Sequence, residues 1–262
     1  MIIDFHAHCF PVKIAAPALE KLSRSAGALT CRSDGTLDGS RKLFAQNSID
    51  LAVMLNIAVT PAQQKSVNDF TAQINGGAIG FGSVHPFAPD ALEELERIHS
   101  MGIKGVKFHP HYQKFPADDK AAFPVYRKAA SLGLITVFHA GHDLSFADND
   151  IASPAAIARA LSAFDGAPVV AAHLGGSMCW QDARKHLAGL PVYLDTAFCH
   201  GNIPLPEAQA ILDRHGADRV LFGTDLPWSG IREEMDFVAS LGLSPRELGQ
   251  VMGGNAARLL GI

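Results

Sequence analysis

Two histidines near the start of the chain, His6 and His8, lie two positions apart in a short apolar segment that begins at Ile2. The segment predicts a β-strand, in which alternate side chains project to one face, so His6 and His8 are expected to share a face with Asp4. Two neighbouring imidazoles can take two positions around one divalent ion. A His-x-His pair is a weak signal alone, so the prediction of a metal site depends on the other polar residues of the chain.

Further polar side chains occur where later apolar segments end. They share this place at the end of an expected strand, and they are His85, Lys107, His109, His139, His173, Asp195 and Asp225. In a parallel barrel the carboxyl ends of all strands meet at one mouth, so residues distant in sequence can lie together there. Histidines and carboxylates suit a borderline divalent ion, with Zn²⁺ the first choice and Mn²⁺, Fe²⁺ or Co²⁺ as alternatives.

The elements that must position these residues are eight short segments rich in β-branched residues. They begin near Ile2, Leu51, Ala78, Gly105, Leu134, Val169, Val192 and Val220. Helical patterns lie between them, for example over 89–101, 153–164 and 206–215. This alternation predicts a single parallel (β/α)₈ barrel domain over residues 1–262. A doubly wound open sheet is the competing fold, but the glycine-rich phosphate fingerprint often found after its first strand is missing here.

The first connection is the longest and predicts an extended loop with an extra helix over residues 9–48. In a barrel this segment leaves the first strand at the mouth, where active sites lie, so it is expected to act as a lid.

The composition excludes several other classes of protein. Hydrophobic residues make up 48% of the 262 residues and charged ones 18%, which is typical of a globular protein with a large core. The net charge of −4 and the lack of a basic cluster argue against a nucleic-acid partner. No apolar run reaches the ~18–20 residues that span a bilayer. Four widely separated cysteines and the lack of a signal-peptide pattern predict a cytoplasmic protein with free thiols, and assembly into a homo-oligomer is left open.

These motifs together resemble the amidohydrolase superfamily, in its amidohydrolase-related branch of metal-dependent hydrolases and decarboxylases. The shared motifs run in order along the whole chain as Asp4-x-His6-x-His8, 105–110 (GVKFHP), 139–141 (HAG), 173–176 (HLGG), 222–227 (FGTDLP) and 254–260 (GNAARLL). The resemblance implies that one divalent metal is held by His6, His8, His139 and Asp225. It places His173 nearby, as a catalytic residue or as a ligand of a second metal.

The chemistry of these residue types agrees with such roles. A divalent metal lowers the pKa of a bound water from ~15.7 toward ~7 and so supplies a nucleophile. Asp225 is expected to accept the proton of this water and pass it to the leaving group. His173 is expected to polarise the carbonyl of the substrate or to stabilise the oxyanion.

Lys107 and Asp4 each have more than one interpretation. In binuclear relatives a lysine at the end of the fourth strand is carboxylated and bridges two metals. Lys107 can instead pair with a carboxylate such as Asp4 or bind a substrate carboxylate. Asp4 is expected to support the site from behind the ligands, by accepting a ring N–H of a metal-binding histidine or by pairing with Lys107. The alternative for Asp4 is a local hydrogen bond to backbone.

Four more residues are candidates for substrate binding at the mouth. They are His109, His111, His142 and Trp228, and loop packing is the alternative role for each. The predicted function is a metal-dependent hydrolase that attacks an amide, ester or lactone of a small molecule with metal-activated water. The alternative is a non-oxidative decarboxylase of an aromatic or unsaturated acid, and a metal-binding barrel without turnover is the third hypothesis.

Overall fold

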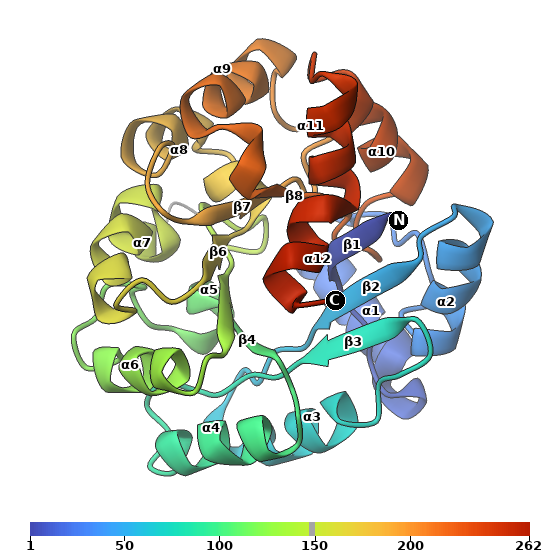
Figure 1. Cartoon of the computed structure of the whole chain (residues 1–262). Helices are drawn as coiled ribbons and strands as arrows, with labels where there is room; N and C mark the ends of the chain where they lie inside the picture. The colour runs from blue at the N-terminus through green and yellow to red at the C-terminus, as the bar shows by residue number, and fades with distance from the viewer. Residues whose placement is uncertain (147–149) are drawn as a thin grey trace.

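The computed structural model describes residues 1–146 and 150–262 and shows a barrel of parallel strands surrounded by helices (Figure 1). The strands are β1 (Ile3–Ala7), β2 (Leu51–Leu55), β3 (Ala78–Phe81), β4 (Gly105–Phe108), β5 (Ile135–Phe138), β6 (Val169–Ala171), β7 (Tyr193–Asp195) and β8 (Val220–Leu221). Each strand begins within one residue of the position that the sequence predicts. The (β/α)₈ barrel is therefore confirmed.

The strands pair in the order β1-β2-β3 and β4-β5-β6-β7-β8, and backbone contacts join these two groups into a closed barrel. Between β3 and β4, Gly82 N donates to Gly105 O (2.9 Å) and Lys107 N donates to Gly82 O (2.8 Å). Between β8 and β1, Phe5 N donates to Phe222 O (2.8 Å). Closure leaves no free sheet edge and brings the carboxyl ends of β1 and β8 next to each other.

Twelve α-helices are present in the described residues, most of them on the outside of the barrel (Figure 1). They are α1 (Val12–Ser25), α2 (Leu37–Gln46), α3 (Gln64–Thr71), α4 (Ala91–Ser100), α5 (Pro110–Gln113), α6 (Phe123–Ser131), α7 (Pro154–Ala160), α8 (Trp180–His186), α9 (Leu205–His215), α10 (Ile231–Ala239), α11 (Pro245–Gly249) and α12 (Asn255–Leu260). Ser153 caps α7 as expected, since its side chain accepts from Ala156 N. Among the described residues, no helix has both the length and the apolarity to cross a membrane.

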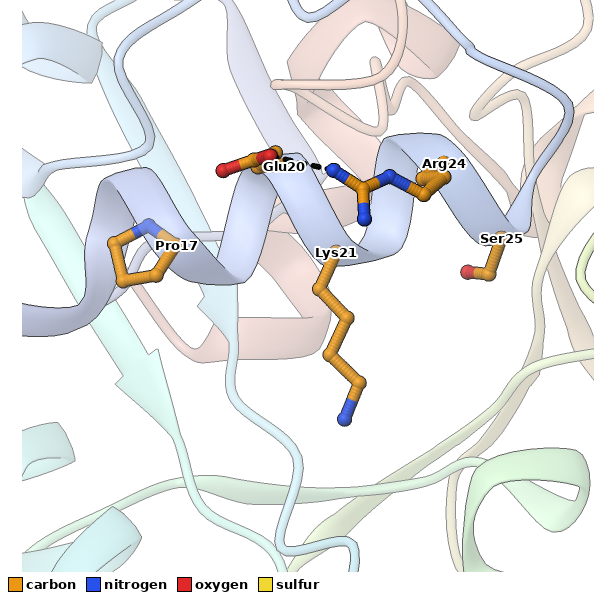
Figure 2. A pocket seen from close by; sticks show the side chains of 5 residues that line it. All are labelled: Pro17, Glu20, Lys21, Arg24 and Ser25. Carbon is orange, nitrogen blue, oxygen red and sulfur yellow. Dashed lines mark hydrogen bonds and ion pairs between the residues drawn. The ribbon is translucent and has the colours of Figure 1, made fainter.

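The segment over residues 9–48 contains two helices, α1 and α2, and so holds the predicted extra helix. Its contacts place it at the mouth of the barrel. Ser25 Oγ at the end of α1 lies 3.1 Å from Ser145 Oγ in the loop after β5, and Arg32 N donates to Pro227 O (2.7 Å) in the loop after β8. A hollow of about 340 Å³ lies along α1. Figure 2 shows its lining, with Lys21 projecting away from the Glu20–Arg24 ion pair.

Two hydrophobic clusters stabilise the fold. The larger one packs the outer face of the strands against the helices. The smaller one fills the barrel between facing strands, where Phe5 and Phe81 make an edge-to-face contact with ring centroids 5.7 Å apart. Ala256 and Leu260 of α12 join this inner cluster. The barrel is thus packed with apolar side chains at one end, and its polar residues gather at the other.

Candidate metal centre and active site

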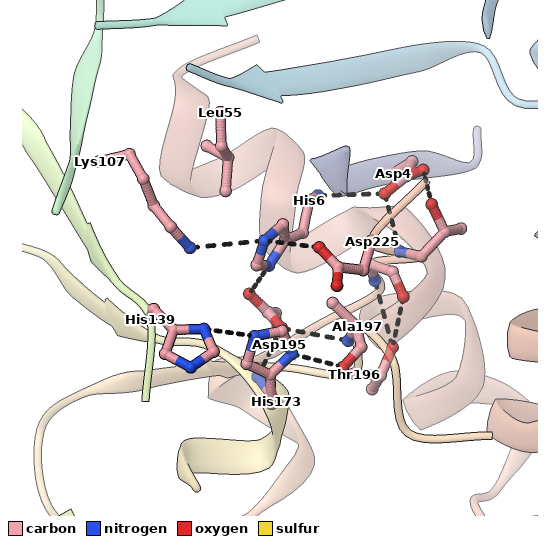
Figure 3. Close-up of polar contacts among 12 residues, drawn as sticks. Asp4, His6, Leu55, Lys107, His139, His173, Asp195, Thr196, Ala197 and Asp225 are labelled. Atoms are coloured by element: carbon pink, nitrogen blue, oxygen red, sulfur yellow. Dashed lines mark hydrogen bonds and ion pairs between the residues drawn. The ribbon is translucent and has the colours of Figure 1, made fainter. Parts of the chain in front are cut away.

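Three of the four predicted metal ligands lie together at the mouth (Figure 3). The Nε2 atoms of His6 and His8 are 3.2 Å apart, which confirms that the two imidazoles stand side by side. Asp225 Oδ1 lies 3.0 Å from His8 Nε2 and 3.3 Å from His6 Nε2. Three potential ligand atoms from β1 and from the segment after β8 therefore converge on one small volume, as the closure of β1 against β8 requires.

The fourth predicted ligand, His139, lies beside His173. The Nδ1 atom of His139 is 3.1 Å from the Nε2 atom of His173, and the ring centroids of His173 and His6 are 5.2 Å apart. The donor atoms thus form two adjoining groups, one of His6, His8 and Asp225 and the other of His139 and His173.

The four histidines share a feature that suits metal binding, because the second ring nitrogen of each contacts an oxygen acceptor. The contacts are His6 Nδ1 with Asp195 Oδ2 (2.8 Å), His8 Nδ1 with Leu55 O (2.7 Å), His173 Nδ1 with Ala197 O (2.8 Å) and His139 Nε2 with His142 O (3.3 Å). Such contacts place the proton on the outer nitrogen and leave the lone pair of the inner nitrogen free. The donor set therefore fits a divalent metal ion.

The ionisation states of the donors agree with this fit. Burial, together with the nearby Lys107, lowers the pKa of His6 to about 4, so that its imidazole is neutral at pH 7. Burial opposes ionisation of Asp225, but His6 and His8 outweigh it and hold the pKa of this carboxyl at about 2. A neutral imidazole and an ionised carboxylate are the forms that bind a metal.

Lys107 of β4 reaches the same centre. Its side chain is 1% exposed, and its Nζ atom lies 3.4 Å from His6 Nε2. Within the described ranges 1–146 and 150–262, it has no carboxylate within ion-pair distance. Burial lowers the pKa of Lys107 to about 8, although Asp195 and Asp225 act in the opposite direction. A buried cation of this kind requires an anionic partner, and none of the residues that the structure describes supplies one at contact distance.

Asp4 binds backbone, the alternative role expected for it, and not a histidine ring or Lys107. The pairing of β1 with β2 shifts register between Asp4 and Ala7, so strict alternation is lost. Asp4 Oδ1 accepts from the backbone N–H groups of His6 and Thr224 (3.0 Å each), and Asp4 Oδ2 accepts from Thr224 Oγ1 (2.6 Å). Asp4 is fully buried and binds backbone and a hydroxyl, rather than Lys107 or a histidine ring. Burial raises the pKa of Asp4 to about 7.

The ring N–H of His6 instead binds Asp195, at the end of β7. The other oxygen of Asp195 accepts from His173 N (2.9 Å) and Ala197 N (3.1 Å). Although burial opposes ionisation, the contact with His6 and the charge of Lys107 lower the pKa of Asp195 below its usual range. The sequence placed Asp195 at a strand end but gave it no role. The feature of the sequence that could have indicated a role for Asp195 was its position at the end of the seventh strand.

The four residues proposed for substrate binding lie at different depths around the candidate metal centre. The rings of His109 and His139 stack 4.1 Å apart, and His109 Nε2 lies 3.4 Å from Asp143 Oδ2. The ring of His111 is buried 5.6 Å from that of His139. The rings of His109 and His111 therefore pack against His139, a predicted metal ligand.

The other two candidates lie nearer to solvent. His142 Nε2 lies 3.5 Å from Asp150 Oδ1, and this carboxylate is largely exposed. Trp228 is half-buried, and its backbone N–H donates to Asp225 O (2.7 Å), which fixes the turn after the carboxylate ligand. Substrate contact remains a prediction for all four candidates.

The backbone at the mouth adopts conformations that L-residues rarely take. His173 has φ +60° and Asp225 has φ +64°, both in the left-handed region. Strain of this kind persists only where surrounding contacts fix it, and it is common at active sites. Gly141 has φ +87°, and a Cβ there would lie 2.3 Å from Ser177 N, so the loops after β5 and β6 can pack closely only with glycine at this position.

The fold and the site together are those of a metal-dependent barrel enzyme, and comparison with known proteins identifies the family. A family profile described as amidohydrolase matches residues 3–262. The chain therefore belongs to the amidohydrolase family, as the sequence motifs indicated. The comparison with curated proteins found no match.

Solved structures with a similar fold include two decarboxylases and a protein provisionally assigned as a hydrolase. The 5-carboxyvanillate decarboxylase of Sphingomonas paucimobilis superposes with a TM-score of 0.70 at 17% identity, over 100% of this chain and 99% of that chain. A dihydroxybenzoic acid decarboxylase from Polaromonas sp. JS666, with bound manganese and the inhibitor 2-nitroresorcinol, gives 0.71 at 17% identity, over 99% and 96%. A protein from Pseudomonas putida, provisionally assigned as a 2-pyrone-4,6-dicarboxylic acid hydrolase, gives 0.69 at 16% identity, over 99% and 97%.

Proposed function

We propose that this chain is a metal-dependent, non-oxidative decarboxylase of an aromatic or unsaturated carboxylic acid. The similarity to two decarboxylases supports this function over hydrolysis of an amide, ester or lactone, which was the first expectation from the sequence. The substrates that the similar proteins are named for all carry at least one carboxylate. Our proposal transfers this feature to the present chain and looks for a group that receives it.

Lys107 is the observation that carries the proposal. Its ammonium group is buried beside the metal donors and has no carboxylate at ion-pair distance in the described part of the chain. A carboxylate of the substrate at this position would supply the missing charge partner and would replace part of the hydration that the lysine has lost. The reacting group would then lie next to His6, at the centre of the donor cluster.

The metal would be held by His6, His8, His139 and Asp225, with His173 adjacent. When bound, a divalent ion such as Zn²⁺ or Mn²⁺ would supply positive charge that stabilises the negative charge developing on the substrate. The second nitrogen contacts of the four histidines keep their inner lone pairs available for this role.

The residues of the chain then transfer the proton that the reaction requires. In the reaction the bond from the substrate to its carboxylate carbon breaks, CO₂ leaves, and the electron pair remains on the substrate carbon, which must take up a proton. We assign this proton transfer to Asp225 and His173, because both border the donor cluster and either could take a proton from water and pass it to the substrate carbon. Tyr112 Oη and, at the end of α1, Ser25 Oγ each lie 3.1 Å from Ser145 Oγ in the loop after β5, and these groups would limit the access of water.

Hydrolysis is the second candidate, and the division of the donors into two groups favours it. His6, His8 and Asp225 could hold one ion and His139 and His173 a second, with a carboxylated Lys107 between them. Hydrolysis of a lactone would then follow the first expectation from the sequence. In this case Lys107 would be modified rather than free to bind a substrate carboxylate.

One screen separates the two candidates. The protein is loaded with Mn²⁺ or Zn²⁺, its metal content is measured, and it is assayed with hydroxybenzoic acids, unsaturated dicarboxylic acids, lactones and amides. Release of CO₂ from an acid supports decarboxylation, whereas ring opening or amide cleavage without CO₂ contradicts it.

A lysine variant then tests the role of Lys107. Lys107→Met should lower kcat/KM for the acid by at least ~10²-fold, because the buried charge partner of the carboxylate is lost. The matched control is Lys104→Met, since Lys104 lies just before the same strand and its Nζ atom donates to Leu260 O (2.5 Å), away from the mouth. Equal activity of the two variants would contradict the role of Lys107.

A further inference from the structure

Glu234 is a buried acid that the proposed reaction does not use. It lies in the first turn of α10, where acidic residues usually point to solvent, yet its side chain is 0% exposed. In residues 1–146 and 150–262 it forms no ion pair with a lysine, arginine or histidine. A buried carboxyl group is costly unless hydrogen bonds compensate for the lost water, so its contacts show what it does.

The carboxyl group of Glu234 binds two loops of the barrel mouth. Ser229 Oγ, in the loop after β8, donates to Glu234 Oε1 (2.6 Å). The backbone N–H groups of Cys199 and His200, in the loop after β7, donate to Glu234 Oε2 at 3.2 Å and 3.0 Å. These contacts direct the carboxyl group toward the two loops rather than toward the N–H groups at the start of its own helix.

Each of these loops holds a residue of the candidate site in place. In the loop after β7, Ala197 O accepts from His173 Nδ1 (2.8 Å), only two residues before Cys199. In the loop after β8, Asp225 O accepts from Trp228 N (2.7 Å), and Ser229 follows directly. The backbone is in the left-handed region at Phe198 (φ +58°) and at Asp225 (φ +64°). Both loops therefore need outside contacts to keep their conformation.

We propose that Glu234 is a positioning residue of the active site, which fixes the loops after β7 and β8 relative to each other and thereby orients His173 and Asp225. Loss of its hydrogen bonds would leave the buried N–H group of Cys199 and the part-buried N–H group of His200 without this acceptor, and the loops would move to find new partners. The positions of His173 and Asp225 would then change, although Glu234 does not contact either residue. The inference rests on the proposed function for its kinetic test, but its metal test does not depend on the reaction.

Two substitutions of similar size separate hydrogen bonding from packing. In Glu234→Gln the amide oxygen can still accept from Cys199 and His200, and the amide N–H can donate to Ser229 Oγ. In Glu234→Leu all acceptors are lost while the volume is kept. The matched control is Asn255→Leu, because Asn255 is also buried and its side chain also binds backbone, by donating to Ala217 O and Val220 O (2.7 Å each), at the start of β8 rather than after its end.

The full-length proteins are compared with Co²⁺ as the probe. Visible absorption of bound Co²⁺ reports ligand geometry, the rate of release to a chelator reports affinity, and kcat and KM are measured with the acid found in the screen. We expect Glu234→Leu to change the Co²⁺ spectrum and to lower metal affinity or kcat by ~10–100-fold, which is typical for residues that orient ligands from behind. Glu234→Gln should keep the parental spectrum and stay within about threefold of the parental kcat.

The proposal is overturned if Glu234→Leu keeps the parental Co²⁺ spectrum, release rate and kcat, or if Asn255→Leu changes them equally. If Glu234→Leu does not fold, Ser229→Ala is measured in the same way, and a parental spectrum and kcat in that variant would also overturn the proposal. If the parent protein decarboxylates no acid, the proposed function fails, and the Co²⁺ spectra alone decide the role of Glu234.

Discussion

His6 Nδ1 lies 2.8 Å from Asp195 Oδ2, and both side chains are buried at the mouth of the barrel. This contact joins the first strand to the seventh and sets the protonation of the imidazole. Because the carboxylate accepts the Nδ1 proton, the lone pair of Nε2 is free and faces His8 and Asp225. The metal-binding form of His6 thus depends on a residue far away in the sequence.

The first prediction is that Asp195→Asn weakens metal binding by ~10–100-fold. The new amide can keep its oxygen toward His173 N and Ala197 N, and its NH₂ group then faces His6 Nδ1. The imidazole would shift its proton to Nε2, the nitrogen that should bind the metal. Competition between the protein and a chelator for Zn²⁺ measures this loss, with thermal unfolding as the check on folding. An unchanged affinity would show that His6 is not oriented by Asp195.

The strands could be predicted from the sequence because both faces of each strand are buried. β-Branched residues therefore form unbroken apolar runs, and all eight starts fall within one residue of those observed. The polar residues at the ends of these runs could be predicted to meet, since a parallel barrel brings every strand end to one mouth. For this reason the sequence alone could predict that His6, His8 and Asp225 lie close together.

The contacts behind the ligands could not be predicted in the same way. For Asp4 the sequence left a histidine ring, Lys107 and local backbone as possible partners, and it could not choose between them. The structure shows backbone and the hydroxyl of Thr224, next to a register shift in β1. Glu234 lies in a helix whose sequence is typical of an exposed surface, and only the folded chain brings it to Cys199 and Ser229. Such contacts join distant segments and leave no periodic pattern in the sequence.

The second prediction concerns Asp225, which is both a proposed ligand and a proposed proton carrier. Asp225→Asn should lower kcat by ~10²–10⁴-fold, the usual effect of losing a general acid or base, while the melting temperature changes little. Turnover with the acid found in the screen and thermal unfolding are measured on the same preparation. Near-parental turnover would move the proton transfer to His173.

The third prediction is that Asp4→Ala affects stability more than metal binding. The substitution removes the acceptor for His6 N, Thr224 N and Thr224 Oγ1, all of them buried. A buried donor left unsatisfied costs about 1–3 kcal/mol, so the free energy of unfolding should fall by at least this amount. Denaturant unfolding measures the loss, and Zn²⁺ competition should show a smaller effect than in Asp195→Asn. A larger loss of Zn²⁺ affinity in Asp4→Ala than in Asp195→Asn would instead show that Asp4 is the partner of a metal ligand.

The last prediction uses Glu234 and the pH dependence of stability. Burial is the main cause that raises the pKa of Glu234 from 4.5 to about 8, and the nearby charge of Asp225 adds to it, against the hydrogen bonds from Ser229, His200 and Cys199. Between these two pH values the folded protein holds a proton that the unfolded chain releases. The contribution of Glu234 to stability must therefore decrease as the pH rises from 4.5 to 8.

Glu234→Gln removes this titration and keeps a side chain that resembles the protonated acid. The free energy of unfolding of the variant should accordingly increase relative to that of the parent as the pH rises through this range. Urea unfolding of both proteins at about pH 5 and about pH 8 measures the change, and the difference between them cancels the titration of Asp4 and of the buried histidines, which both proteins share. A difference that stays constant with pH, or falls toward pH 8, would mean that Glu234 is ionised in the folded protein at neutral pH.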